Sequence, residues 1–281
     1  VAVSELTKAH KKKSSSDSSV RSSVTGVAKI SALLFVLLST SNAVQAAQVA
    51  QGGGSATGSE SIAIGSNSKA QADNSIAMGV GANTKPTVSN IEGSGLYGVA
   101  IGSNATVQDE HSVAIGHDAR NTSVLEGAAK DQVQTAKSAV AIGHNASTHF
   151  SGTVAIGHNA EARGQSAIVI GENAKTISPW NDSTNRYAQA YRTTLIGFSA
   201  QASGTNTIGM GSHTRALANN AMVFGYAANS GHVDAIVMGR EAKTQGSQSA
   251  SGGSIAIGLK ANAGSADNNR PSTAVGANSY V

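Results

Sequence analysis

Residues 139–143 read Ala-Val-Ala-Ile-Gly, and residues 153–157 read Thr-Val-Ala-Ile-Gly, so that the two closing glycines lie 14 positions apart. This pentad of small or hydroxyl, aliphatic, small, aliphatic and glycine residues occurs 13 times between residues 61 and 276. Seven of the 12 gaps between closing glycines are 14 residues long, and such a fixed period is the signature of a repeat architecture. We expect the closing glycines to be structural: Gly65, Gly79, Gly102, Gly116, Gly143, Gly157, Gly171, Gly197, Gly211, Gly225, Gly239, Gly258 and Gly276.

Each repeat has the pattern of two short strands and two turns. The aliphatic residues Ile62 and Ile64 alternate with Ala63, and a second alternation follows at Ala70 and Ala72. Two strands and two turns in 14 residues form one coil of a flattened solenoid, in which each strand pairs in parallel with its copies above and below. The sequence therefore predicts an all-β parallel solenoid of about 13 coils over residues 61–281.

The predicted core is small. Ala-rich strands opposite a single aliphatic strip bury little apolar area for each coil. We therefore expect about three chains to share their aliphatic and small-residue faces.

Five longer gaps place insertions near residues 85–98, 121–137, 175–192, 244–253 and 265–271. Loops on a rigid scaffold commonly carry recognition, and Trp, Tyr and Arg are the residue types that anchor interfaces. The third insertion supplies the candidate ligand-binding residues, although packing of this loop onto the solenoid or a neighbouring subunit explains them equally well. They are Trp180, Arg186, Tyr187, Tyr191 and Arg192.

The composition excludes several classes of protein. Of 281 residues, 32 are glycine, 13% are charged and 4% are aromatic, which is unlike the core of a conventional enzyme. The 40% hydrophobic content argues against disorder, and glycine has no collagen period. Without cysteine, the chain has no disulfide framework, thiolate metal site or cysteine nucleophile.

Residues 1–46 have the order of a secretory signal region: a basic stretch, an apolar run over residues 30–38, and small residues before an expected cleavage after Ala46. A transmembrane anchor is the alternative, but nine residues are fewer than the roughly 20 that a spanning helix needs. This leader holds six basic and two acidic residues, which accounts for the net charge of +4. The remaining chain has 14 of each sign, so we expect no nucleic-acid partner. Residues 47–60 are interpreted as a lead-in to the repeats.

Three histidines, His117, His144 and His158, share the position directly after the pentad glycine. They would form a column of metal ligands or simply occupy a solvated turn, where Ser66, Ser103 and Glu172 stand in other repeats. Because no carboxylate recurs beside them, we favour the solvated turn and expect no metal and no cofactor. The turns lack repeated calcium-binding aspartates, the period of 14 is not that of hexapeptide acyltransferases, and no catalytic constellation is found, so we expect no enzyme activity.

The repeated Ser-Val/Ile-Ala-Ile-Gly-x-x-Ala unit, over about residues 55–281, resembles the head repeats of trimeric autotransporter adhesins of the Yersinia adhesin A type, also called Hep/Hag repeats. The leader, with Lys11, Lys12 and Lys13, resembles the extended signal region of the same family. The resemblance implies a left-handed parallel β-roll, a homotrimer and display at the cell surface on an outer-membrane fibre.

The same resemblance implies binding to extracellular matrix proteins, host-cell receptors or other bacteria, and a passive spacer or coat segment is the alternative. Stalk heptads and carboxy-terminal membrane strands are not in this sequence, and it begins at Val1. We therefore expect the head portion of a longer chain, with membrane anchoring only through a C-terminal region that is absent here.

Overall fold

The computed structural model describes residues 48–84, 96–122, 137–177, 180–181, 186–187, 190–245, 253–264 and 271–281. The leader and its cleavage site after Ala46 lie outside these ranges, as does part of the third insertion and most of each of the other four. Every described element is a β-strand, and none of the described ranges holds a helix with the length and apolarity needed to span a membrane.

The first strand of each coil belongs to a 14-stranded parallel sheet, here the first sheet. Its strands, in order, are β1 (Val49–Gln51), β3 (Ile62–Ile64), β5 (Ile76–Met78), β7 (Val99–Ile101), β9 (Val113–Ile115), β11 (Val140–Ile142), β13 (Val154–Ile156), β15 (Ile168–Ile170), β19 (Thr194–Ile196), β21 (Ile208–Met210), β23 (Met222–Phe224), β25 (Ile236–Met238), β27 (Ile255–Ile257) and β29 (Thr273–Val275).

The second strand of each coil belongs to a 13-stranded parallel sheet, here the second sheet. Its strands are β2 (Ser55–Ala56), β4 (Lys69–Ala70), β6 (Asn83–Thr84), β8 (Thr106–Val107), β10 (Arg120–Asn121), β12 (Ser147–Thr148), β14 (Glu161–Ala162), β16 (Lys175–Thr176), β20 (Gln201–Ala202), β22 (Arg215–Ala216), β24 (Asn229–Ser230), β26 (Lys243–Gln245) and β28 (Asn262–Gly264). A separate two-stranded antiparallel sheet joins β17 (Trp180–Asn181) and β18 (Arg186–Tyr187).

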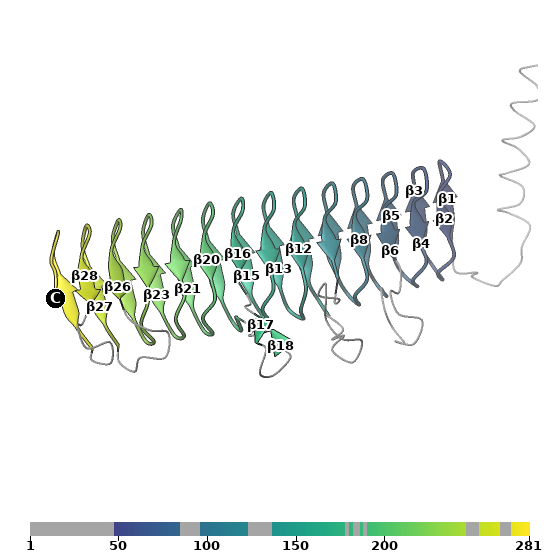
Figure 1. Ribbon diagram of the computed structural model, residues 1–281. Helices are drawn as coiled ribbons and strands as arrows, with labels where there is room; N and C mark the ends of the chain where they lie inside the picture. Colours follow the sequence, from purple (N-terminus) through teal and green to yellow (C-terminus); the bar gives the residue numbers. More distant parts are fainter. Residues whose placement is uncertain are drawn as a thin grey trace, which may run out of the picture. The chain divides into compact units, whose positions relative to one another are not determined.

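The two sheets are the flat sides of one stacked roll (Figure 1). Equivalent residues of neighbouring pentads pair directly: Val140 pairs with Val113 on one side and Val154 on the other. The predicted parallel β-solenoid is therefore confirmed. The stack begins before the first pentad, because β1 pairs with β3 and β2 pairs with β4, so the expected lead-in at 47–60 contains a coil of its own.

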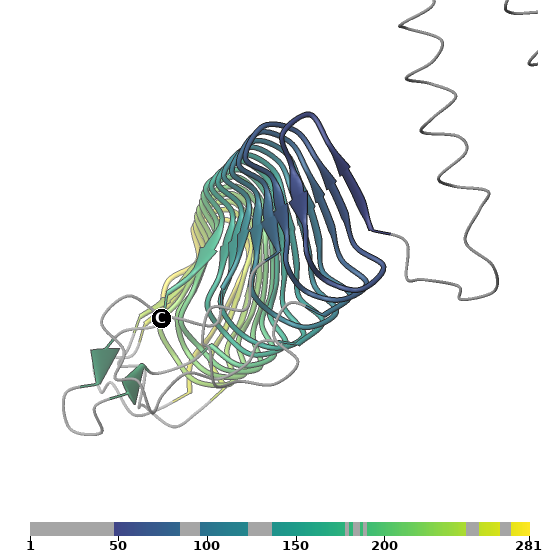
Figure 2. The ribbon, with the colours of Figure 1, turned by 90° about the vertical axis from the view of Figure 1, so that its right-hand side faces the viewer.

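The interior of the roll consists of the small residues. Ala63, Ala77 and Ala100 at pentad centres have no exposed surface, whereas the flanking Ile62 and Ile64 lie partly exposed on the outer face. This differs from the expected core, in which the aliphatic strip faces the Ala-rich strands. The end-on view shows why: each coil is flat and the two sheets lie close together (Figure 2), so the space between them suits methyl-sized side chains.

The turn after each pentad is built from a glycine and a left-handed residue. Gly143 has φ 130°, and Asn145, two residues later, has φ 55°. Asparagine tolerates the left-handed region better than most residues. The backbone N–H of Asn145 donates to the backbone carbonyl of His117 in the preceding coil at 3.0 Å, which fixes the register of adjacent turns.

Insertions leave the roll at only one of its two edges. Each of the five insertions begins at or directly after a strand of the second sheet, namely β6, β10, β16, β26 or β28, and the third also contains β17 and β18. The opposite edge, where the first sheet turns into the second, keeps the same four-residue turn in every coil from β3 onward, and the coil of β1 and β2 has a turn one residue shorter. The fold thus has one regular edge and one variable edge.

Candidate functional site

The regular edge of the roll is formed by the two residues that follow each pentad glycine, and we call these positions the short-turn edge. Their backbones hydrogen-bond from coil to coil: the Asn159 amide donates to the His144 carbonyl at 2.9 Å, and the Asn173 amide donates to the His158 carbonyl at 2.8 Å. Side chains on this edge therefore stand in register. Side chains of the same type at equivalent positions of neighbouring turns are therefore repeated at the spacing of the coils.

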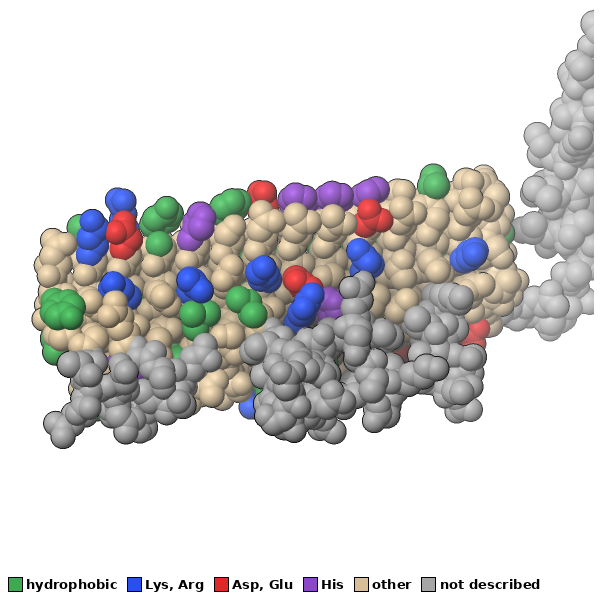
Figure 3. All heavy atoms as spheres, viewed as in Figure 1, with side chains coloured by type: hydrophobic (Ala, Val, Ile, Leu, Met, Phe, Trp, Pro, Cys, Tyr) green, Lys and Arg blue, Asp and Glu red, His purple; other side chains and the backbone are tan. Residues whose placement is uncertain are grey.

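His117, His144 and His158 form a column on the short-turn edge. The ring centroids of His117 and His144 lie 5.0 Å apart, and those of His144 and His158 also lie 5.0 Å apart. The rings of His144 and His158 are nearly parallel, with 8° between their planes. Histidine side chains follow one another along this edge of the molecule in Figure 3.

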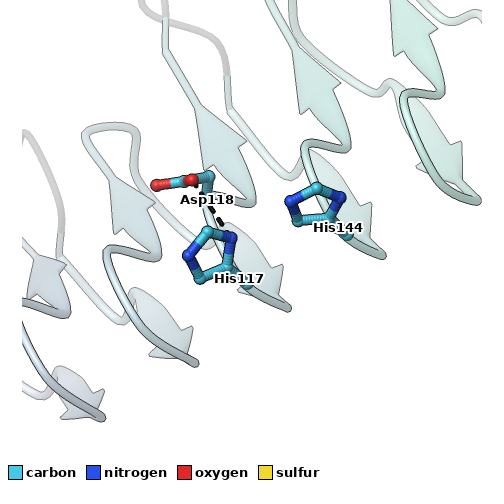
Figure 4. A group of neighbouring side chains, drawn as sticks. All are labelled: His117, Asp118 and His144. Carbon is cyan, nitrogen blue, oxygen red and sulfur yellow. Dashed lines mark ion pairs between the residues drawn. The ribbon is translucent and has the colours of Figure 1, made fainter.

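Carboxylates stand at both ends of this column. The Nδ1 atom of His117 lies 3.1 Å from Oδ2 of Asp118, and Nδ1 of His158 lies 3.6 Å from Oε1 of Glu172. One ligand atom each from His117, Asp118 and His144 lies within 4.8 Å of the other two, and the three side chains cluster at one point of the edge (Figure 4). The structure therefore places carboxylates beside this histidine column, which the repeat pattern of the sequence did not predict.

Aromatic side chains continue the short-turn edge toward the carboxy-terminal coils. Phe198 is 44% exposed and packs edge-on against His213, which in turn packs edge-on against Tyr226. Tyr226 is 50% exposed, and the guanidinium carbon of Arg240 lies 5.8 Å from its ring centroid. Sequence reasoning missed this group because it searched for aromatics only in the insertions. Phe198 and Tyr226 both directly follow a pentad glycine, and that shared position is the signal that would have found them.

The ligand-binding residues predicted in the third insertion lie at the variable edge. The backbone of Trp180 pairs with that of Tyr187, and Arg186 belongs to the same small sheet. The side chains of these three residues lie outside the described part of the chain. Tyr191 and Arg192 are exposed, and the Arg192 amide donates to the Gln165 carbonyl at 3.0 Å.

Tyr97, at the end of the first insertion, stacks on His111 of the next coil with a centroid distance of 4.9 Å. Two further histidines lie away from both clusters. Burial lowers the pKa of His149 to about 4, with the Arg163 and Arg120 charges acting in the same direction and Glu161 opposing them. Burial also lowers the pKa of His232, which is 1% exposed. Neither histidine Nδ1 has a hydrogen-bond partner among the described residues.

Four segments of the chain match the family described as YadA head domain repeat (2 copies), over residues 56–82, 94–119, 135–160 and 202–228. Each matched segment spans strands of both sheets and includes one short turn or more. No curated protein matches the chain significantly.

Proposed function

We propose that this chain, which belongs with the YadA-like adhesin heads, forms a homotrimeric, non-enzymatic head that is displayed at the outer-membrane surface and attaches the cell to external targets. The matched repeats support this function, because the heads of this family are trimeric and adhesive. The proposed targets are extracellular matrix proteins, host-cell receptors or other bacteria. Export through the inner membrane rests on the sequence of residues 1–46, with cleavage after Ala46.

The outer faces of the two sheets differ, and this difference carries the trimer proposal. The first sheet presents aliphatic and Met side chains outward, including Met78, Met210 and Met238 at 38–44% exposure. Outward positions of the second sheet are mainly polar, such as Lys69, Arg120 and Glu161. A continuous apolar sheet face of this length is a mark of an interaction site in soluble proteins. Three copies burying this face against one another would supply the core that each thin roll lacks.

The oligomeric state is tested by measuring the mass of the purified chain by light scattering. The expected mass is three times that of one chain. Glutamate at Val140 and Val154, which are adjacent on the apolar face, is expected to convert the trimer to smaller species. Thr106→Glu on the outer face of the second sheet is the matched control and should leave the mass unchanged. A wild-type monomer would contradict the trimer proposal.

Trimerisation also suits adhesion by avidity. Three chains present the same patches, so that weak individual contacts add through effective concentration. The second candidate, a passive spacer, predicts the same mass but no contact with a target. Coating of surfaces carrying collagen, fibronectin or whole cells by the purified trimer separates the two. Adhesion is expected, and failure to bind any of these surfaces would favour the spacer.

Two surfaces are candidates for target recognition: the third insertion and the roll itself, with its short-turn edge. Deleting residues 177–190 removes most of the third insertion while keeping Lys175 and Thr176 of β16 and the pentad that begins at Thr193. We expect the deletion to weaken target binding and to leave the trimer folded, as judged by its mass and its circular dichroism. Unchanged binding would assign recognition to the roll itself, where the exposed aromatics of the short-turn edge are the leading residues.

A further inference from the structure

We propose that His117, Asp118 and His144 form a binding site for a late divalent transition-metal ion such as Zn²⁺ or Cu²⁺. This inference is independent of the adhesive function. Imidazole and carboxylate groups are the donor set that such ions prefer in a site without cysteine. Three protein ligands leave at least one coordination position for water.

The geometry of the cluster is close to that of a bound ion. Two ligand atoms that are each about 2.1 Å from one metal ion can lie at most about 4.2 Å apart. The ligand atoms of the three residues already lie within 4.8 Å of one another. His117 is 52% exposed and Asp118 is 34% exposed, so small side-chain rotations close the remaining distance without backbone movement. Figure 4 shows the three side chains coming from two adjacent turns.

The scaffold holds the backbones of these ligands in place. The His117 carbonyl accepts the Asn145 amide at 3.0 Å, and the Asp118 amide donates to the Ser103 carbonyl at 2.9 Å. Each histidine therefore emerges from a turn that is hydrogen-bonded to the turns above and below it. Pre-organised ligands lose less freedom when the ion binds, which favours affinity.

Asp118 is not needed for the shape of its turn. It has φ 54°, and the same left-handed position is occupied by asparagine in six other turns: Asn67, Asn104, Asn145, Asn159, Asn173 and Asn278. Aspartate at this one turn adds a carboxylate beside two imidazoles, where asparagine would satisfy the backbone alone. The substitution Asp118→Asn therefore removes a ligand charge and keeps the fold.

The histidine column also has safe replacements within the chain. Ser66, Ser103 and Ser212 occupy the position of His144 in other turns, so His144→Ser is expected to fold normally. His213→Asn is the matched control. It removes an exposed histidine from the same edge, at a left-handed position that asparagine suits, and its ring neighbours are Phe198 and Tyr226.

The test is isothermal titration of Zn²⁺ into the tag-free, chelator-treated chain at pH 7.5, together with Cu²⁺ electron paramagnetic resonance. We expect about one ion per chain, nitrogen hyperfine coupling in the Cu²⁺ spectrum, and a metal affinity lower by about tenfold or more in His144→Ser and in Asp118→Asn. His213→Asn should bind as the wild type does.

Thermal unfolding supplies a second measurement. An ion that binds only the folded chain raises the unfolding midpoint, so Zn²⁺ should raise it for the wild type and for His213→Asn but much less for the two site variants. Absence of Zn²⁺ binding to the wild type would overturn the proposal. So would wild-type affinity in both site variants, or an equal loss of affinity in His213→Asn.

Discussion

Leu195 and Gly209 are direct partners at the centres of neighbouring strands, and each compensates for the size of the other. Leu195 pairs with Gly209 in the first sheet, and both residues are buried. A Cβ atom added to Gly209 would lie 2.8 Å from Cδ1 of Leu195. Most coils have alanine at the pentad centre, and Leu195, the largest fully buried side chain of the described residues, is accommodated by the smallest possible neighbour.

The pair predicts non-additive effects on stability. Leu195→Ala should lower the free energy of unfolding by about 2–5 kcal/mol, because it leaves a cavity in the roll. Gly209→Ala alone should also destabilise, through the contact with Leu195. In the double variant the added methyl group occupies part of the cavity, so the combined loss should be smaller than the sum by about 1 kcal/mol. Chemical denaturation of the four proteins measures this difference, and strict additivity would contradict it.

Substitution of a pentad glycine by alanine is expected to destabilise the fold strongly, although it adds only one methyl group. Gly116 has φ 135°, and a Cβ added there would lie 2.4 Å from the Gly143 carbonyl oxygen of the next coil. Because neither backbone can move without disturbing the stack, Gly116→Ala should lower the free energy of unfolding by about 3 kcal/mol or more.

Gly152→Ala is the control for this position. Gly152 also has a positive φ of 67°, but its added Cβ would meet only ordinary contacts, the nearest being Ser166 Oγ at 3.5 Å. It should therefore cost about 1–2 kcal/mol, as expected for the left-handed conformation alone. Equal losses for the two variants would show that conformation, and not contact between coils, explains the pentad glycine.

Much of the fold could be predicted from the sequence, because the repeat imposes one local structure many times. Glycines such as Gly143 and Gly157 mark the coils, and alternation around Ala141 and Ala155 marks the strands. The side of the strand that faces inward could not be predicted in the same way. Alternation assigns two faces but does not tell which one is buried, and here the narrow gap between the sheets selects alanine over isoleucine.

The candidate sites were less predictable, for a related reason. The column of His117, His144 and His158 was visible as a shared repeat position, but its pairing with Asp118 depends on the side-chain geometry of a turn. Phe198 and Tyr226 are separated by one coil whose edge carries His213 one position later, so their contact follows from stacking and not from a regular spacing of aromatics.

The exposed aromatics of the short-turn edge predict a defined loss of target binding if recognition lies on the roll. Phe198→Ala combined with Tyr226→Ala should lower the affinity for the bound matrix protein or cell by about tenfold or more, since exposed aromatics beside arginine are typical interface anchors. Stability should change by about 0.5 kcal/mol or less, because both side chains lie at the surface. Val80→Ala, at the same turn position and 57% exposed, is the matched control for surface binding assays. Full binding by the double variant would leave the third insertion as the recognition surface.

His149 predicts a dependence of stability on pH. Burial lowers its pKa from the ordinary 6.5 to about 4 in the folded chain. As the pH falls from 6.5 to 4, the unfolded chain takes up a proton at this histidine and the folded chain does not. The free energy of unfolding therefore decreases as the pH falls across this interval, by up to about 3 kcal/mol at about 1.4 kcal/mol for each pKa unit. Above pH 6.5 His149 is neutral in both states, and its contribution to stability is then fully present.

His149→Gln should remove this contribution, so that the difference in unfolding free energy between the variant and the wild type changes steadily between pH 6.5 and 4 and is constant outside that range. Comparing the two proteins cancels the titration of the carboxylates that they share, Glu161 included. Nuclear magnetic resonance of the His149 ring gives a direct check, with a midpoint expected near pH 4. A midpoint near 6.5 would show that water reaches the ring, and the stability of the wild type would then lack this dependence on His149.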